Sequence, residues 1–261
     1  MTSPPLPPEL EQIIFTLALE NHLKDQKNLI FVAWRVYHWL VPLIFRVVLL
    51  HSNRALPIKF NKAVYERHGH YTQHLLLEPD YLCKYLYLFP NVRNLALWTD
   101  NAHLHLDSLK KLPLTHLSIS PLYLKPPSFE LFQVFSNLTH LDLVSVLSAW
   151  TAPRDHLATF KELLYLPKLT HLCVSPRFSI HGIELFLDRK RCGKLRVVIV
   201  CAFIDGDTYL EDEIPWGIED QRVLNLKCHS IRDWEVGARG GTDMWTFADD
   251  ILASRSDEMN W

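Results

Sequence analysis

One short phrase recurs along the middle of the chain, and this recurrence limits the possible folds more than any other feature of the sequence. In its clearest form the phrase is Leu-Thr-His-Leu, which occupies residues 114–117, 138–141 and 169–172. Weaker copies keep the alternation of apolar residues. Aligned on one apolar position, the copies are anchored at Leu75, Leu95, Leu117, Leu141, Leu172, Val198 and Leu224. Because no such unit can bury its apolar residues alone, we expect the units to stack around one continuous core.

Each copy has the pattern of a short strand. Alternation turns the anchor and the residue two places later toward one shared core. Helical phrases at 81–86, 129–135, 157–164 and 183–187 would fill the other side of that core. The shortest interval between anchors, from Leu75 to Leu95, is 20 residues and the longest, from Leu141 to Leu172, is 31; most intervals are typical of leucine-rich repeats. We therefore predict an α/β fold, with an irregular leucine-rich-repeat solenoid of parallel short strands and convex helices over residues 47–230.

The position just before each anchor also recurs, and it is mostly histidine. Because neighbouring strands lie about 4.7–4.9 Å apart, these residues would form a row on the concave face of the solenoid. The row could bind a metal, contact a protein, or simply be a polar surface position that the repeat carries along. A metal needs converging ligands, whereas side chains on a curved sheet diverge, so we predict no metal and no cofactor. We predict instead that a protein target contacts His74, Asn94, His116, His140, Asp142 and His171.

Two helices are predicted at the N-terminus. Pro7 and Pro8 suit the first turn of a helix, and the spacing of apolar residues extends that helix over 8–20. A second helix is expected over 26–40, ended by Pro42. Its apolar residues surround nearly the whole helix, with Trp34 and Tyr37 outside the main stripe. Such a helix must be buried on more than one side, so its second side meets either the downstream repeats or another protein.

The same segment carries the pattern of a known family. It reads Leu-Pro-Pro-Glu-Leu at 6–10, Ile-Ile at 13–14, Asn-Leu at 28–29, Val-Ala-Trp-Arg at 32–35, Trp at 39 and Pro-Leu-Ile-Phe-Arg at 42–46. This resembles the F-box, and in particular the short F-box-like proteins that are numerous in fungi. The resemblance implies that residues 1–46 form a small helical bundle that docks on the Skp-type adaptor of a cullin–RING ubiquitin ligase. It assigns adaptor contacts to Leu6, Pro7, Leu10, Ile14, Leu29, Val32, Trp34 and Trp39.

A helical cap is predicted over residues 231–261, a segment that also resembles the ending common in these fungal proteins. Thr242 is expected to cap a final helix over 243–253. Trp234, Trp245 and Phe247 would then close the last repeat, because a solenoid needs a cover at each end.

The composition limits which binding partners and which cellular compartment we expect. The formal net charge is -2, and no basic stripe predicts a nucleic-acid surface. The first residues lack the pattern of a signal peptide, and arginines interrupt the apolar stretch over 29–50, so we expect no membrane association. The five cysteines are scattered and never form a C-x-x-C pair, which is typical of free thiols in a reducing compartment. We expect a cytoplasmic or nuclear protein.

These patterns predict a non-catalytic protein, because the sequence has no G-x-S-x-G, P-loop or H-E-x-x-H motif. The leading hypothesis is the substrate-recognition subunit of an SCF-type ubiquitin ligase, which holds the adaptor at one end and a protein target at the other. The alternative is a repeat scaffold whose N-terminal helices no longer bind the adaptor. Asn28 and Ala33 leave room for it, because the family usually has an acidic residue at the first position and Ser or Cys at the second.

Overall fold

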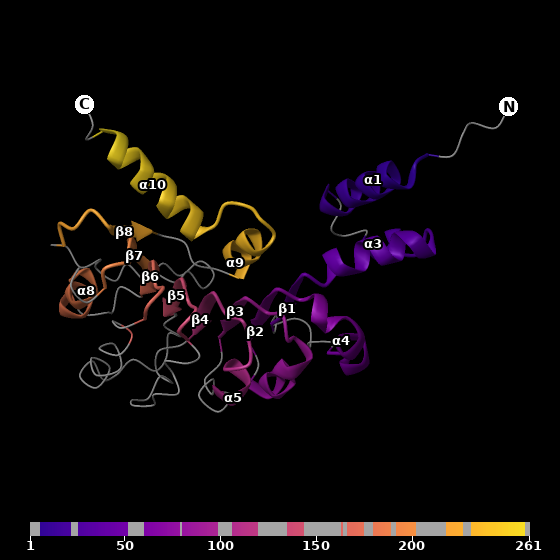
Figure 1. Cartoon of the computed structure of the whole chain (residues 1–261), viewed down its shortest axis with the longest axis horizontal. Helices are drawn as coiled ribbons and strands as arrows, with labels where there is room; N and C mark the ends of the chain where they lie inside the picture. Colours follow the sequence, from indigo (N-terminus) through magenta and orange to yellow (C-terminus); the bar gives the residue numbers. More distant parts are fainter. Residues whose placement is uncertain are drawn as a thin grey trace.

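The computed structural model describes residues 6–21, 26–51, 60–78, 80–98, 106–119, 135–143, 163, 166–174, 180–188, 192–201, 218–226 and 231–258. Within these residues the chain is an α/β protein built on one all-parallel, eight-stranded sheet (Figure 1). The strands are β1 (Val47–Leu50), β2 (His74–Leu77), β3 (Asn94–Leu97), β4 (His116–Ile119), β5 (His140–Leu143), β6 (His171–Val174), β7 (Val197–Cys201) and β8 (Val223–Leu226). Each strand pairs with the next one along the chain, which is compatible with a solenoid-like stack of repeated units.

The strand register confirms most of the predicted alignment. Leu75 lies opposite Leu95, and the anchors continue in register across the sheet as far as Val198. The last anchor is wrong by one residue, because Val198 lies opposite Val223 and Leu224 lies opposite Ile199. A shift of one residue moves a side chain to the other face of a sheet. The prediction failed because both faces are apolar at this end, so the alternating sequence of β8 fits either register.

The main core lies on one face of the sheet, where apolar side chains of the strands meet those of the connecting segments. These segments include α4 (Lys62–His68), η3 (Asp80–Leu88), α5 (Leu106–Leu109) and α8 (Ile180–Leu187). A short 3₁₀ helix, η2 (Gly69–Tyr71), follows α4 directly. The helical phrases predicted at 81–86 and 183–187 are η3, a 3₁₀ helix, and α8; those at 129–135 and 157–164 lie mostly outside the described residues. Phe89 and Phe186 are almost fully buried in this core, and burial of each such ring contributes about 2–3 kcal/mol.

The N-terminal helices are α1 (Pro8–Asn21), α2 (Gln26–Leu29) and α3 (Trp34–Ile44). The first agrees with the prediction, but the single helix expected over 26–40 is wrong. The helix is interrupted after α2, and Ala33 is extended before α3 begins. The expected end at Pro42 is also wrong, since α3 continues to Ile44. Burial of Leu40 and Val41 offsets the backbone hydrogen bond that Pro42 cannot make.

The C-terminal residues form α9 (Ile231–Ala238) and α10 (Met244–Glu258). The final helix predicted over 243–253 is confirmed as α10, and its first residues pack on the last strands, but the two helices do not close the end of the sheet as the predicted cap would. They lie on the face of the sheet opposite the main core (Figure 1). Trp234 packs near β1–β3, at the far end of the sheet from the last repeat. Asp243, rather than Thr242, caps α10, because its carboxylate accepts a hydrogen bond from the Thr246 N–H at 2.9 Å. We call residues 231–258 the arm.

Apolar residues explain why the arm lies across this face. Leu76, Ala96 and Ile199 all point away from the main core and would meet water if nothing covered them. The sequence shows that such residues need a cover but not which segment provides it. Among the described helices, none is long and apolar enough to cross a membrane.

Candidate interaction surfaces

The N-terminal segment exposes an unusual number of large apolar side chains. Trp34 and Phe31 are the most exposed members, with 74% and 81% of their surface in solvent. The patch, which we call the N-terminal patch, consists of Leu6, Leu10, Ile13, Ile14, Leu17, Phe31, Val32 and Trp34. In Figure 1, α1 and α3 stand beside the β1 end of the sheet, away from the other strands. The patch is therefore open to a second protein.

Most of the residues that the F-box resemblance assigned to adaptor contacts lie on this surface. Leu6, Pro7, Leu10, Ile14, Val32 and Trp34 are exposed. Leu29 and Trp39 are half-buried instead, because they pack on the small core formed by Leu19, Val36 and Leu40. Sequence analysis did not single out Phe31 as an adaptor contact, although its place in an apolar run outside the main stripe was a usable signal.

The small core and one ion pair hold the patch in place. Arg35 at the start of α3 donates two hydrogen bonds to the Glu11 carboxylate on α1, at 2.7 and 2.8 Å. A paired guanidinium and carboxylate of this kind fixes orientation as well as distance. The packing of α1 on α3 therefore holds the patch residues in place through contacts within the N-terminal helices themselves.

A groove of about 300 Å³ continues from Trp34 into the space between α3 and the α4–η2 segment. The indole of Trp34 stacks on the Tyr37 ring with centroids 5.4 Å apart, and the Tyr37 hydroxyl is hydrogen-bonded to His68 Nε2 at 3.2 Å. Burial, with the nearby charge of Arg67, lowers the pKa of His68. The groove is lined by Trp34, Tyr37, His38, Val41, Pro42, Arg67, His68 and Tyr71. It joins the N-terminal patch to α4.

The row of residues before the anchors runs across the opposite face of the sheet from the core. Its members, which we call the polar row, are His74, Asn94, His116, His140 and His171. The rings of His116, His140 and His171 are stacked nearly parallel, with centroids 4.0 and 4.1 Å apart. The predicted alignment is confirmed by the strand register. Side by side, the imidazoles do not converge, and no cluster of three or more potential metal ligands occurs among the described residues.

A threonine orients each of the three stacked rings. Thr139 Oγ1 donates a hydrogen bond to the carbonyl oxygen of Thr115 at 3.1 Å and also lies 2.8 Å from Nδ1 of His140. This short contact holds the Nδ1 edge of the His140 ring against the threonine hydroxyl. Equivalent contacts join Thr115 to His116 and Thr170 to His171. The repeated Thr-His pair thus fixes the orientation of each ring.

Burial keeps these rings neutral. It lowers the pKa of His140 to about 2, with further repulsion from His116 and His171. Burial likewise lowers the pKa of His116 and of His74, each to about 4. Burial also lowers the pKa of His171, although the hydrogen bond and the negative charge of Asp249 act in the opposite direction. At neutral pH the row is therefore an uncharged polar and aromatic surface.

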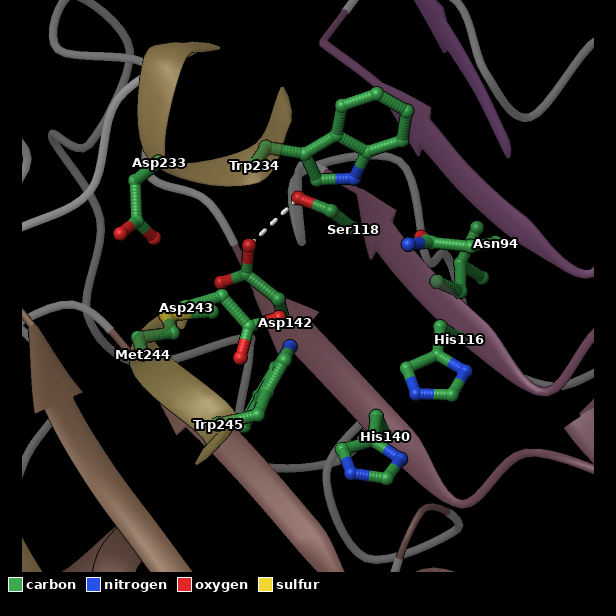
Figure 2. A pocket seen from close by; sticks show the side chains of 11 residues that line it. Asn94, His116, Ser118, His140, Asp142, Asp233, Trp234, Asp243, Met244 and Trp245 are labelled. Atoms are coloured by element: carbon green, nitrogen blue, oxygen red, sulfur yellow. Dashed lines mark hydrogen bonds between the residues drawn. The ribbon is translucent and has the colours of Figure 1, made fainter. Parts of the chain in front are cut away.

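A buried chain of hydrogen bonds lies beside the row. The Trp98 indole N–H donates to Ser118 Oγ at 2.8 Å, and the Ser118 hydroxyl donates to Asp142 Oδ2 at 2.6 Å. A cavity of about 20 Å³ adjoins this chain, which is room for about one water molecule. Figure 2 shows it between the strand residues Asn94, His116, Ser118, His140 and Asp142 and the arm residues Asp233, Trp234, Asp243, Met244 and Trp245.

The arm covers the face that was predicted to bind a target. Trp245 meets the rings of His140 and His171 edge-on, with centroids 5.2 and 5.9 Å apart. Asp142 and His171 are each only 3% exposed, and the other members of the row are half-buried. The expectation of an open concave surface is therefore wrong for this structure, because the prediction placed the arm at the end of the solenoid. Whether these residues contact a target stays a prediction.

Comparisons with known proteins give no relative for this chain. No family model matches it, and neither the curated proteins nor the solved structures contain a match. Two surfaces of the chain itself bear on its function: the N-terminal patch, which is exposed, and the polar row, which the arm covers.

Proposed function

We propose that this chain is the substrate-recognition subunit of an SCF-type ubiquitin ligase. In this proposal α1–α3 are an F-box-like bundle that docks on a Skp-type adaptor, and the parallel sheet is a degenerate leucine-rich-repeat domain that holds a protein target. The observation that carries the proposal is the exposure of the N-terminal patch. It combines with the F-box-like sequence of residues 6–46.

The size of the patch supports a protein partner. Its eight large apolar side chains are each at least two-fifths exposed. Together they leave several hundred Å² of apolar surface in water, and removing that surface would contribute on the order of 10 kcal/mol at roughly 25 cal/mol per Å². Monomeric proteins seldom expose contiguous apolar surfaces of this size unless the surface is functional. Trp34 is 74% exposed, and tryptophan is among the residue types that most often anchor an interface.

The proposed role is one of proximity rather than chemistry. Helices α1 and α3 stand beside the β1 end of the sheet, so an adaptor bound to their exposed side chains would leave the other strands accessible (Figure 1). Other subunits of the ligase would then transfer ubiquitin to a target held by this chain. The proposal requires no catalytic residue here.

A pull-down of the full chain with a Skp-type adaptor tests the proposal. Leu10→Ala/Trp34→Ala removes two exposed side chains of the patch and should abolish capture while circular dichroism stays unchanged. Val64→Ala/Tyr87→Ala is the matched control, because both side chains are exposed and apolar but lie outside the patch. Failure of the folded, unmutated chain to bind the adaptor would contradict the proposal.

One set of contacts favours the alternative, a repeat scaffold in which α1–α3 only cover the end of the sheet. Tyr37 is hydrogen-bonded to His68, and Phe45 packs on His68 and Tyr65, so α3 is joined to α4. Under this alternative, deletion of residues 1–46 should unfold the repeats, whereas an adaptor-binding module should be removable with little loss of melting temperature.

A further inference from the structure

The arm lies on the sheet through two apolar regions separated by a polar one. Near β1–β3, Trp234 and Ala238 pack on Leu76 and Ala96. Near β6–β8, Met244 and Ala248 pack on apolar residues that include Ile199. Between these regions the start of α10 faces the polar row and the buried Ser118–Asp142 pair.

The polar region contains the water-sized cavity, and the indole nitrogen of the buried Trp234, which lines it, has no hydrogen-bond partner among the described protein residues. In Figure 2 this nitrogen lies on the side of the ring that faces Ser118 and Asn94. Polar and water-sized space of this kind contributes less apolar burial than the regions on either side of it, so the arm is held less firmly here than at its two apolar contacts.

The arm contacts the polar row through a specific pair of side chains. The ring of Trp245 lies edge-on to His140 and His171. Asp249 lies four residues later, and its carboxylate is 3.3 Å from both His171 Nε2 and the Arg196 guanidinium. Residues four apart share one side of a helix, so the row and Arg196 together contact an aromatic ring and a carboxylate one helical turn apart.

We propose that the arm occupies a ligand-binding face of its own chain. When the arm lifts, this face binds a helical segment of a target protein, and that segment carries an aromatic residue and a carboxylate four positions apart. In the closed state the arm occupies the face at the high local concentration of a tethered segment and excludes weaker ligands. The proposal rests on the target-recognition half of the proposed function. It does not involve the N-terminal patch, so a failure of adaptor binding and a failure of this proposal would be distinguishable.

A peptide-binding measurement on the full chain tests which segment the face binds. The probe is a fluorescein-labelled peptide with the sequence of residues 242–258, and the readout is fluorescence anisotropy. Trp245→Ala/Asp249→Asn in the protein weakens the internal contact, and we expect it to bind the probe at least tenfold more tightly than the unmutated chain does. A probe carrying the same two substitutions should not bind.

The same helix offers a matched control. Phe247→Ala/Asp250→Asn removes the same kinds of side chain from the exposed side of α10 and should leave probe binding at the level of the unmutated chain. If the Trp245→Ala/Asp249→Asn chain keeps its fold by circular dichroism and binds the probe no better than the control, the arm is a fixed cover and the proposal is wrong.

Native-state hydrogen exchange of the unmutated chain decides the same question without a variant. The amides in the middle of α9 and α10 should open together and exchange at least 100-fold faster than those of β4 and β5. Exchange of the arm and of the central strands at the same rate would mean that the arm opens only when the whole molecule unfolds, and this result would overturn the proposal even if the double variant failed to fold.

Discussion

The N-terminal patch and the face beneath the arm both hold apolar side chains, but only the first of these surfaces is exposed. Trp34 is 74% exposed, whereas Trp234 is 8% exposed because the arm brings it onto the sheet. Both surfaces would be a liability in water, but the chain covers only one of them with its own residues. Under the two proposals made above, the patch binds another molecule, while the arm controls access to the second face.

The largest expected effect on stability separates the two tryptophans. Trp234→Ala should lower the free energy of unfolding by about 3 kcal/mol, because it leaves a cavity against Leu76 and Ala96. Trp34→Ala should change it by less than about 0.5 kcal/mol, since the ring is largely in water already. Urea denaturation measures both. Equal losses from the two substitutions would mean that the patch is part of the fold rather than an open surface.

As the pH is lowered, the face beneath the arm should be destabilised before the N-terminal patch is. The folded-state pKa values of His140 and His116, about 2 and about 4, lie below the ordinary value of 6.5. The unfolded chain therefore takes up protons first as the pH falls below 6.5, and stability is lost from there down toward the folded pKa values. Each histidine contributes up to about 1.4 kcal/mol per pH unit in this window. Asp243, Asp249 and Arg196 also face the row and modify this slope.

Chemical denaturation at pH 7.0, 6.0 and 5.0 measures this pH dependence. His140→Gln should flatten the loss of stability between pH 6.5 and 5, because the glutamine takes up no proton in either state. His38→Gln is the control, since His38 is exposed on α3 and outside the polar row. A slope that is the same in both variants and in the unmutated chain would show that the stacked rings are not the source of the acid sensitivity.

The sequence could predict the features that depend on residues close together along the chain, but not those that depend on contacts between distant segments. The alternation of apolar residues and the repeated Thr-His pair are local, so the positions of Leu75 to Val198 and the alignment of the histidines were predictable. The first strand, β1, was not recognised because residues 47–50 lack the repeated phrase. The split between α2 and α3 was missed because the apolar residues of 26–40 suit a helix throughout, and only the packing around Leu29 and Val36 selects the break.

The burial of the polar row could not be predicted in the same way. His171 is covered by Asp249 and Trp245, residues more than seventy positions later. A helix pattern in the sequence shows that the arm has an apolar side, but it does not show which surface of the sheet receives that side. The exposure of the N-terminal patch was left open for the same reason, because a helix that is apolar nearly all round can meet either its own chain or another one.

A smaller effect concerns the hydrogen-bond chain beneath the arm. Ser118→Ala removes one hydrogen bond from each of Trp98 and Asp142 in a buried site, and should cost about 1–3 kcal/mol of stability. Ser254→Ala is the matched control: its hydroxyl donates to the Ile251 carbonyl on the exposed part of α10, and its loss should cost less than about 0.5 kcal/mol. Thermal melting monitored by circular dichroism measures both. A neutral result for Ser118→Ala would mean that water replaces the hydroxyl in the adjoining cavity.

The smallest effect is expected at the ion pair behind the N-terminal patch. Arg35 is 60% exposed on its side chain, so Arg35→Met should lower stability by less than about 1 kcal/mol, as exposed ion pairs usually contribute little. Its effect on adaptor binding should be larger than its effect on stability, because the pair sets the orientation of α1 relative to α3 and hence of Leu10 relative to Trp34. Titration of the adaptor against Arg35→Met and against Lys62→Met, an exposed ion-pair variant on α4, separates the two contributions. Equal affinities for the two variants would show that the patch does not depend on this pair for its shape.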